Sequence, residues 1–154
     1  MKMPNMIVTT FAIILVIGFT GFFLRDDGRV GRGQIGLEVG VPIEHPLQTA
    51  YDTTPLPVVL RLVNNTDDIA DLTADGPCKI FRYIVMTANG GFVQSVVTPD
   101  ICNETRTRAA LAEGDVLEEI RQIPLDTNRY KAGDYRLRVK FWNYEGDASF
   151  TLTK

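Results

Sequence analysis

The chain has 154 residues, of which 45% are hydrophobic and 23% charged, and its formal net charge is −3 with a pI near 5.1. Two cysteines exclude a disulfide-dense scaffold and a four-cysteine zinc site. A single histidine argues against zinc-enzyme and catalytic-triad chemistry, and the acidic pI argues against a general nucleic-acid binder.

Residues 6–24 form a run of 19 residues without a charge, and 14 of them are hydrophobic. As a helix rising about 1.5 Å per residue, this run spans roughly 28 Å, close to the thickness of a bilayer core. The sequence therefore predicts a single N-terminal transmembrane helix, with residues 1–24 as a membrane anchor. The alternative is a signal peptide cut after Thr20, although signal-peptide apolar regions usually run only about 7–15 residues. Three phenylalanines near the outer end of the anchor are expected to pack against neighbouring helices, lipid or pigment: Phe19, Phe22 and Phe23.

Residues 25–33 are expected to form a linker, because they hold three glycines and five charges. The three arginines on this side of the anchor outnumber Lys2 on the other, which by the positive-inside rule favours a cytoplasmic C-terminal domain. Large domains are translocated largely regardless of charge, however, and a bridged cysteine pair requires an oxidising compartment. We therefore expect a single-pass protein of the bacterial cytoplasmic (inner) membrane, with its C-terminal domain on the periplasmic, extracytoplasmic side.

From residue 34 the hydrophobic pattern changes to period two, which is typical of half-buried strands. Asn89-Gly90 predicts a hairpin turn, residues 116–123 fit a strand or one helical turn, and residues 42–55 and 98–115 are expected to be irregular. A further turn is expected at residues 144–147. About eight short strands without an amphipathic helix predict an all-β antiparallel sandwich over residues 34–154. The expected strands are 34–41, 58–62, 69–74, 79–87, 92–97, 134–142 and 148–153, with 116–123 as the eighth.

No constellation in the sequence points to catalysis. His45 lies in a proline-bounded loop, and neither Ser95 nor Ser149 sits in a nucleophile elbow. The acidic run Asp67, Asp68, Asp71 and Asp75 lacks the glycine and terminal glutamate of a calcium-binding loop, which favours solvated turns. We therefore expect a protein that is not an enzyme and that holds no cofactor and no metal.

Cys78 and Cys102 each lie beside a predicted loop. A bridge between them would clamp the long loop to the start of a strand and add about 3 kcal/mol of stability in an oxidising compartment. The alternative is a pair of reduced thiols. We expect the bridge.

A second candidate feature is the predicted strand 134–142, on which basic side chains alternate with hydrophobic ones. Arg136, Arg138 and Lys140 share one face of it, which is either a docking surface for an acidic partner or simply a solvated sheet face. Trp142 and Tyr144 follow near its end and fit either an interface or core packing. These five residues form the possible interface.

Several stretches of the domain resemble the intracellular proteinase inhibitor (BsuPI-type) family of immunoglobulin-like sandwiches. They are Leu60-Arg61-Leu62-Val63-Asn64-Asn65-Thr66, Phe81-Arg82-Tyr83-Ile84-Val85-Met86 followed by Asn89-Gly90, Leu111-Ala112-Glu113-Gly114-Asp115, and Ala132-Gly133-Asp134-Tyr135-Arg136-Leu137. The resemblance implies an immunoglobulin-like fold. It carries no inhibitory residue over to this chain, because Phe92 stands where the family often has a tryptophan and Glu113 replaces a usual proline.

The resulting hypothesis is a non-enzymatic, single-span membrane protein. Its helix and extramembrane β-sandwich would make it an accessory or scaffolding subunit of a larger membrane protein complex, for example a respiratory or photosynthetic one. The expected partners are therefore the membrane and other subunits, and not nucleic acid. The alternative is a membrane-tethered proteinase inhibitor or a peptide- or protein-binding module.

Overall fold

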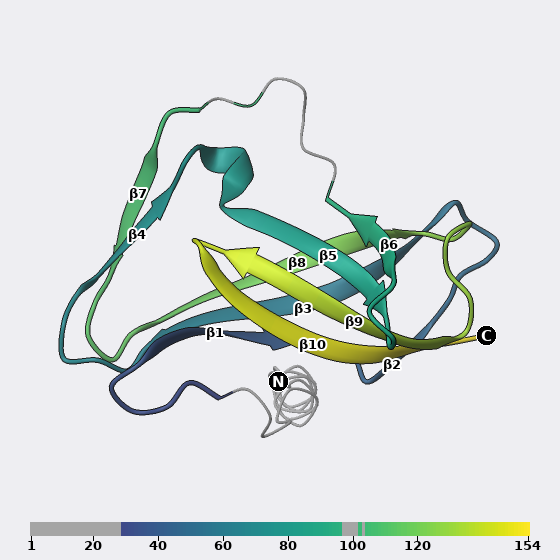
Figure 1. The fold of residues 1–154 in the computed structure, drawn as a ribbon, viewed down its shortest axis with the longest axis horizontal. Coiled ribbons are helices and arrows are strands. Elements are labelled where there is room, and N and C mark those ends of the chain that lie inside the picture. The colour runs from purple at the N-terminus through teal and green to yellow at the C-terminus, as the bar shows by residue number, and fades with distance from the viewer. Residues whose placement is uncertain (1–28, 97–101, 103) are drawn as a thin grey trace, which may run out of the picture.

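The computed structural model describes residues 29–96, 102 and 104–154, and in this part of the chain the fold is all-β (Figure 1). The all-β prediction is thereby confirmed, with ten strands and one 3-10 turn in the described part in place of about eight strands. The elements are β1 (Ile35–Gly40), β2 (Glu44–Pro46), β3 (Thr53–Asn64), β4 (Ala70–Ala74), η1 (Pro77–Lys79), β5 (Phe81–Thr87), β6 (Phe92–Ser95), β7 (Thr107–Leu111), β8 (Val116–Asp126), β9 (Gly133–Phe141) and β10 (Tyr144–Thr153).

Two open sheets face each other in a sandwich-like arrangement, with β9 and β10 lying over β1, β3 and β8 in Figure 1. One sheet has the order β1-β3-β8 and the other β2-β10-β9-β5-β6. The core lies between them because β3 and β9 each turn alternate apolar side chains inward. Those of β3 are Leu56, Val58, Leu60 and Leu62, and those of β9 are Leu137, Val139 and Phe141, all with 0% exposure.

A third, two-stranded sheet of β4 and β7 continues the β3–β8 ladder past a bend. The bend is held by Asn64, whose side chain is fully buried. Its Nδ2 donates to the carbonyl oxygens of Asp68, Leu111 and Ala112 at 2.8, 3.1 and 3.0 Å. Its Oδ1 accepts from the main-chain N–H of Thr66 at 3.1 Å and from the Thr66 hydroxyl at 2.6 Å. The side-chain amide of Asn64 thus bonds both the β3–β4 connection and the chain where β7 leads into β8.

The prediction of a turn at residues 144–147 is wrong. The chain reverses at Trp142 and Asn143, both with positive φ (48° and 69°), and β10 begins at Tyr144. Gly146, which suggests a turn in the sequence, lies inside β10 because β1 passes close to it. A Cβ at this position would come within 2.7 Å of the Leu37 carbonyl oxygen and of a methyl group of Val39. The glycine here serves close packing between the two sheets.

Two short strands appear where irregular chain is expected. β2 pairs in parallel with the end of β10, Thr151 lying opposite Glu44, and β7 pairs with β4. Their partners are distant in sequence, and neither strand shows a clear hydrophobic alternation. The ambiguous segment 116–123 is a strand, since all of β8 pairs with β3. Asn89-Gly90 does form the β5–β6 turn, in which the Thr87 N–H donates to the Gly91 carbonyl at 2.8 Å.

The predicted anchor, residues 1–24, lies outside the described residues, as do Phe19, Phe22 and Phe23. Among the described residues no helix has the length and apolar character needed to cross a membrane. The end of the predicted linker is in contact with the sheet. The Val30 N–H donates to Glu38 Oε1 at 3.1 Å, and Asn65 Nδ2 donates to the Val30 carbonyl at 2.8 Å. The chain thus enters the domain along β1 and β3.

Candidate interaction surface on the five-stranded sheet

The three basic residues of β9 lie on its outer face. Tyr135, Leu137, Val139 and Phe141 alternate with them and are buried. Two of the three bases pair with acidic residues directly opposite on β10. Arg138 Nε lies 2.9 Å from Asp147 Oδ1, and Lys140 Nζ lies 3.7 Å from Glu145 Oε1. The hydrogen bond to Asp147 raises the pKa of Arg138 above its usual value.

Arg136 differs from its two neighbours on β9. It lies opposite Ser149 of β10 and Met86 of β5, neither of which carries a charge. It also lines a shallow hollow of about 340 Å³, together with Ile43 and side chains of β9 and β10. Within the described chain Arg136 has no ion pair, so its charge is available to a partner.

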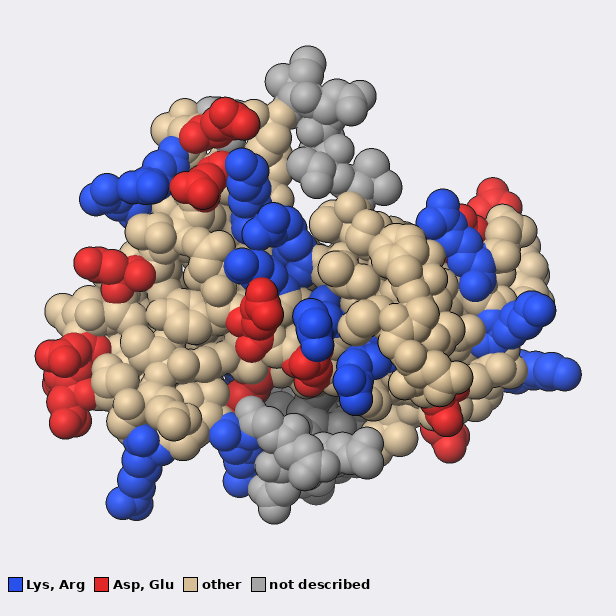
Figure 2. Space-filling view, in the orientation of Figure 1, with Lys and Arg blue, Asp and Glu red and all other residues tan. Residues whose placement is uncertain are grey.

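On the other side of β9, the outer face of β5 adds a further base and an exposed aliphatic side chain. Arg82 lies opposite Lys140, and its Nε is buried without a hydrogen-bond partner among the described atoms. Ile84 lies opposite Arg138 and is 41% exposed. Figure 2 shows Lys and Arg side chains across the middle of this face, with acidic side chains beside them. We call the following group the basic sheet surface: Arg82, Ile84, Arg136, Arg138 and Lys140.

Trp142 and Tyr144, the other two residues of the possible interface, belong largely to the core. Trp142 is only 8% exposed and lies in the buried cluster, and Tyr144 is half-buried against it. The main-chain N–H of Trp142 donates to the Ile80 carbonyl at 2.9 Å, which fixes the β9–β10 turn against the start of β5. Of the two alternatives for these aromatic residues, the structure therefore favours core packing.

Cys78 and Cys102 form a disulfide, as predicted. Cys78 lies in η1, just before β5, and Cys102 lies between β6 and β7. Their Cα atoms are 6.1 Å apart, within the range of protein disulfides. The bridge joins the start of β5 to the long β6–β7 connection.

The other candidate reactive groups have structural contacts. His45 Nε2 donates to the Pro55 carbonyl at 3.0 Å, and burial lowers the pKa of the imidazole. The acidic run is exposed at Asp67, Asp68, Asp71 and Asp75, and Asp75 pairs with Arg106 at 3.7 Å. In the part of the chain that the structure describes, no three His, Cys, Asp or Glu residues are grouped to hold a metal ion.

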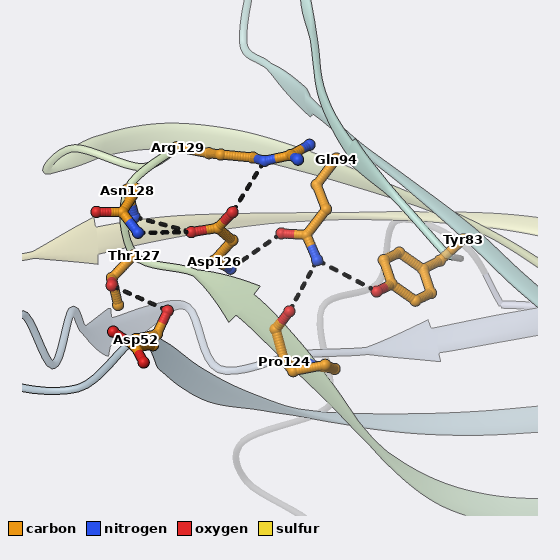
Figure 3. A network of polar contacts seen from close by, with 8 residues as sticks. All are labelled: Asp52, Tyr83, Gln94, Pro124, Asp126, Thr127, Asn128 and Arg129. Atoms are coloured by element: carbon orange, nitrogen blue, oxygen red, sulfur yellow. Dashed lines mark hydrogen bonds and ion pairs between the residues drawn. The ribbon is translucent and has the colours of Figure 1, made fainter.

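Gln94 is an important residue that the sequence analysis missed. Its side chain leaves β6 and bonds the backbone of β8 in the opposite sheet (Figure 3). Nε2 donates to the Pro124 carbonyl at 2.8 Å and to the Tyr83 hydroxyl at 3.3 Å, while Oε1 accepts from the Asp126 N–H at 3.1 Å. The amide therefore takes the place of a neighbouring strand at the end of β8. The only sign of this role in the sequence is that Gln94 is a polar residue within a short hydrophobic strand.

Past β8 the network continues into the loop that leads to β9 (Figure 3). Asp126 Oδ1 accepts from the Asn128 N–H at 3.1 Å, and Asp126 Oδ2 lies 3.0 Å from Arg129 Nε. The Asn128 bond is the main cause that lowers the pKa of the Asp126 carboxyl. The Thr127 hydroxyl donates to the carbonyl of Asp52 at 3.0 Å, which ties this loop to the start of β3. These contacts are structural.

No family model and no curated protein matches the chain. Among solved structures, β-glucosidase from Listeria innocua in complex with isofagomine matches with a TM-score of 0.42 and 11% identity, over 77% of this chain and 16% of that one. The same enzyme with gluconolactone gives 0.38 and 12%, over 81% and 17%. The GH3 β-glucosidase of Bifidobacterium adolescentis gives 0.38 and 18%, over 77% and 17%. This chain spans about a sixth of the length of these enzymes, and at such TM-scores the likeness bears on no activity.

Proposed function

We propose that the protein is a non-enzymatic, single-span protein of the bacterial cytoplasmic membrane that serves as an accessory or scaffolding subunit of a membrane protein complex. The observation that carries the proposal is the uncharged run of 19 residues joined, through a short linker, to a domain of strands. One span is too simple for transport. A sheet domain offers surfaces on which other subunits can assemble.

The fold we propose for the domain is an immunoglobulin-like sandwich. Two features support it. The grouping of β1, β3 and β8 against β5, β9 and β10 matches the grouping of A, B and E against C, F and G in that fold. The Tyr135 hydroxyl, near the start of β9, donates to the Lys131 carbonyl at 2.9 Å and accepts from the Lys131 N–H at 3.1 Å. A tyrosine bonded back in this way at the corner before strand F is a hallmark of such sandwiches.

The basic sheet surface is the docking site we propose for an acidic region of a partner subunit. Its ion pair between Arg138 and Asp147 is exposed and that between Lys140 and Glu145 is partly exposed, and surface pairs contribute little to stability. They can therefore exchange partners at low cost when a second protein approaches. Arg136, which has no ion pair within the described chain, and the exposed Ile84 supply a charged and an apolar contact on the same sheet face.

Reversing the charge of Arg136 tests this surface. We expect Arg136→Glu to reduce the amount of partner protein that co-purifies with the full chain after gentle detergent extraction, by roughly tenfold, because one opposite-charge contact becomes a repulsion. The measurement is quantitative mass spectrometry of the native-gel band. Arg108→Glu, an equal charge change on exposed β7, is the control and should leave the yield unchanged. Equal yields for both variants would contradict the docking site.

The alternative function is a membrane-tethered proteinase inhibitor or peptide-binding module. Its support is the family resemblance, and the same experiment separates the two functions. A native band that contains this chain with a protease and no other membrane protein would favour the inhibitor. A band with several membrane subunits favours the accessory role.

A further inference from the structure

Among the described residues β8 is an edge strand, and the prolines of the β3–β8 ladder show which of its main-chain groups do not bond β3. Pro55 of β3 lies opposite Pro124 of β8, and Pro57 lies opposite Gln122. A hydrogen-bonded antiparallel pair exchanges two N–H···O bonds, and proline has no N–H. These are therefore the non-bonded pairs of the ladder. The N–H and C=O groups of the even-numbered residues of β8 consequently point away from β3, toward the edge.

Two observations agree with this assignment. The Asn64 N–H donates to the Asp115 carbonyl at 3.0 Å, which places the odd-numbered positions in the bonded set. Gln94 reaches the carbonyl of Pro124 and the N–H of Asp126, both even-numbered, from the edge side. The Gln94 amide thus occupies the edge from residue 124 onward.

No other described strand covers the rest of this edge. Between residues 116 and 122 the outward main-chain groups bond no other described segment, since β8 pairs with β3 alone. The residues concerned are Val116, Glu118, Ile120 and Gln122. Ile120 is 57% exposed at the centre of this stretch. A long edge with free N–H and C=O groups is a template for pairing with another strand.

We propose that β8 pairs antiparallel with β8 of a second copy of this chain, about a two-fold axis through Ile120. This arrangement extends the β1-β3-β8 sheet continuously across two molecules. Each outward N–H and C=O between Glu118 and Gln122 then bonds the second copy, and the interface is isologous, as two-fold symmetry requires.

Charge selects this register over its neighbours. The hydrogen-bonded pairs across the edge must join even-numbered residues, and this condition is met by an axis at any whole residue number, so the alternative registers differ by steps of one residue in the axis position. An axis at residue 119 sets Glu119 against its own copy, and an axis at residue 121 does the same for Arg121. An axis at residue 118 opposes two copies of Glu118. Like charges directly opposite one another destabilise a sheet.

An axis at residue 122 fails for a different reason. It brings Ile120 opposite Pro124, which lacks an N–H and whose carbonyl Gln94 already occupies. With the axis at Ile120, Glu119 of each copy lies opposite Arg121 of the other, and Glu118 lies opposite Gln122. Glu119 and Arg121 already pair within one chain, where Arg121 Nε donates to Glu119 Oε2 at 2.8 Å. In the dimer, two further Glu119–Arg121 contacts form between the copies.

The apolar side chains on the outer face of the β1-β3-β8 sheet also favour an axis at Ile120. Val59 lies opposite Ile120 in the β3–β8 ladder and is buried, whereas Ile120 is exposed at the edge. Pairing sets two copies of Ile120 side by side and makes a row that runs from Val59 of one copy to Val59 of the other. Ile120 thereby loses much of its exposure to water.

Charge reversal with rescue tests the pairing, with the full chain in a mild detergent and analytical ultracentrifugation as the measurement. Glu119→Arg and Arg121→Glu should each weaken the dimer roughly tenfold or more, since two opposite-charge contacts become two repulsions. The double variant Glu119→Arg with Arg121→Glu restores opposite charges and should recover the affinity. A double variant as weak as the single variants would overturn the proposal, as would a wild-type chain that stays monomeric at about 100 μM.

Crosslinking tests the register itself. Facing Cα atoms of a hydrogen-bonded antiparallel pair are about 5.5 Å apart, within disulfide range. Since the two natural cysteines are bridged, Ile120→Cys adds a lone thiol at the proposed axis. It should form a disulfide-linked dimer under mild oxidation at least tenfold faster than Ile69→Cys, whose native side chain is 69% exposed and which lies just before β4, outside the proposed pairing. Equal rates would refute the register, even where the chains associate through other segments.

Discussion

Replacing both Cys78 and Cys102 by serine is expected to lower the free energy of unfolding of the β domain by about 3 kcal/mol. The bridge closes a loop with a sequence separation of 24 residues. In the chain-entropy account, such a loop removes freedom from the unfolded chain worth about this amount. The effect should be large because the bridge ties the start of β5 to the connection between β6 and β7, which belong to two different sheets.

Fluorescence of Trp142 during urea unfolding is the natural measurement. Trp142 is the single tryptophan and lies in the core, so it reports on the β domain. Wild-type protein treated with a reductant should unfold at the same urea concentration as the double serine variant, and the reductant should not affect that variant. A midpoint that is insensitive to both changes would show that the bridge contributes nothing to stability.

Asn64→Ala should cost a comparable amount, roughly 3 kcal/mol or more. The substitution leaves the buried carbonyl of Leu111 and the partly buried carbonyl of Ala112 without this donor and frees the Thr66 hydroxyl. An unsatisfied buried polar group costs about 1–3 kcal/mol, and several are created at once. Since Asn64 joins both connections of the β3–β8 and β4–β7 ribbon, we expect the bend itself to loosen.

Its neighbour supplies a matched control. Asn65 is exposed and donates chiefly to the Val30 carbonyl at 2.8 Å. Asn65→Ala should therefore lose no more than about 1 kcal/mol in the same urea experiment. Comparable losses for the two variants would mean that the buried amide does not hold the bend. Hydrogen exchange should also show faster exchange in β4 and β7 for Asn64→Ala alone.

Much of the strand pattern was predictable because alternation records which face of a strand is buried. β1, β5 and β9 show it clearly, and Asn89-Gly90 marks the turn after β5. The bridge was also predictable, since only two cysteines exist and both adjoin loops. The strands and the turn depend on local sequence, and with only two cysteines a single intramolecular pairing is possible.

Other features depend on contacts between distant segments, which one sequence does not reveal. β2 exists because the end of β10 lies beside it. Gly146 resembles a turn glycine, yet it serves the approach of β1. Gln94 and Asn64 look like ordinary polar residues, although each satisfies main-chain groups far along the chain. The basic face of β9 was recognised, but its pairing with Asp147 and Glu145 depends on the register of β10.

The mass of the native particle that contains this chain tests the proposed role as an accessory membrane subunit most directly. We would extract the full chain from its own membranes with a gentle detergent and measure the particle by native mass spectrometry, identifying the mature N-terminus in the same sample. We expect a chain that retains residues 1–24 and is bound to several other membrane proteins. A particle that contains only this chain, as a monomer or dimer, or a chain that begins near Gly21, would contradict it.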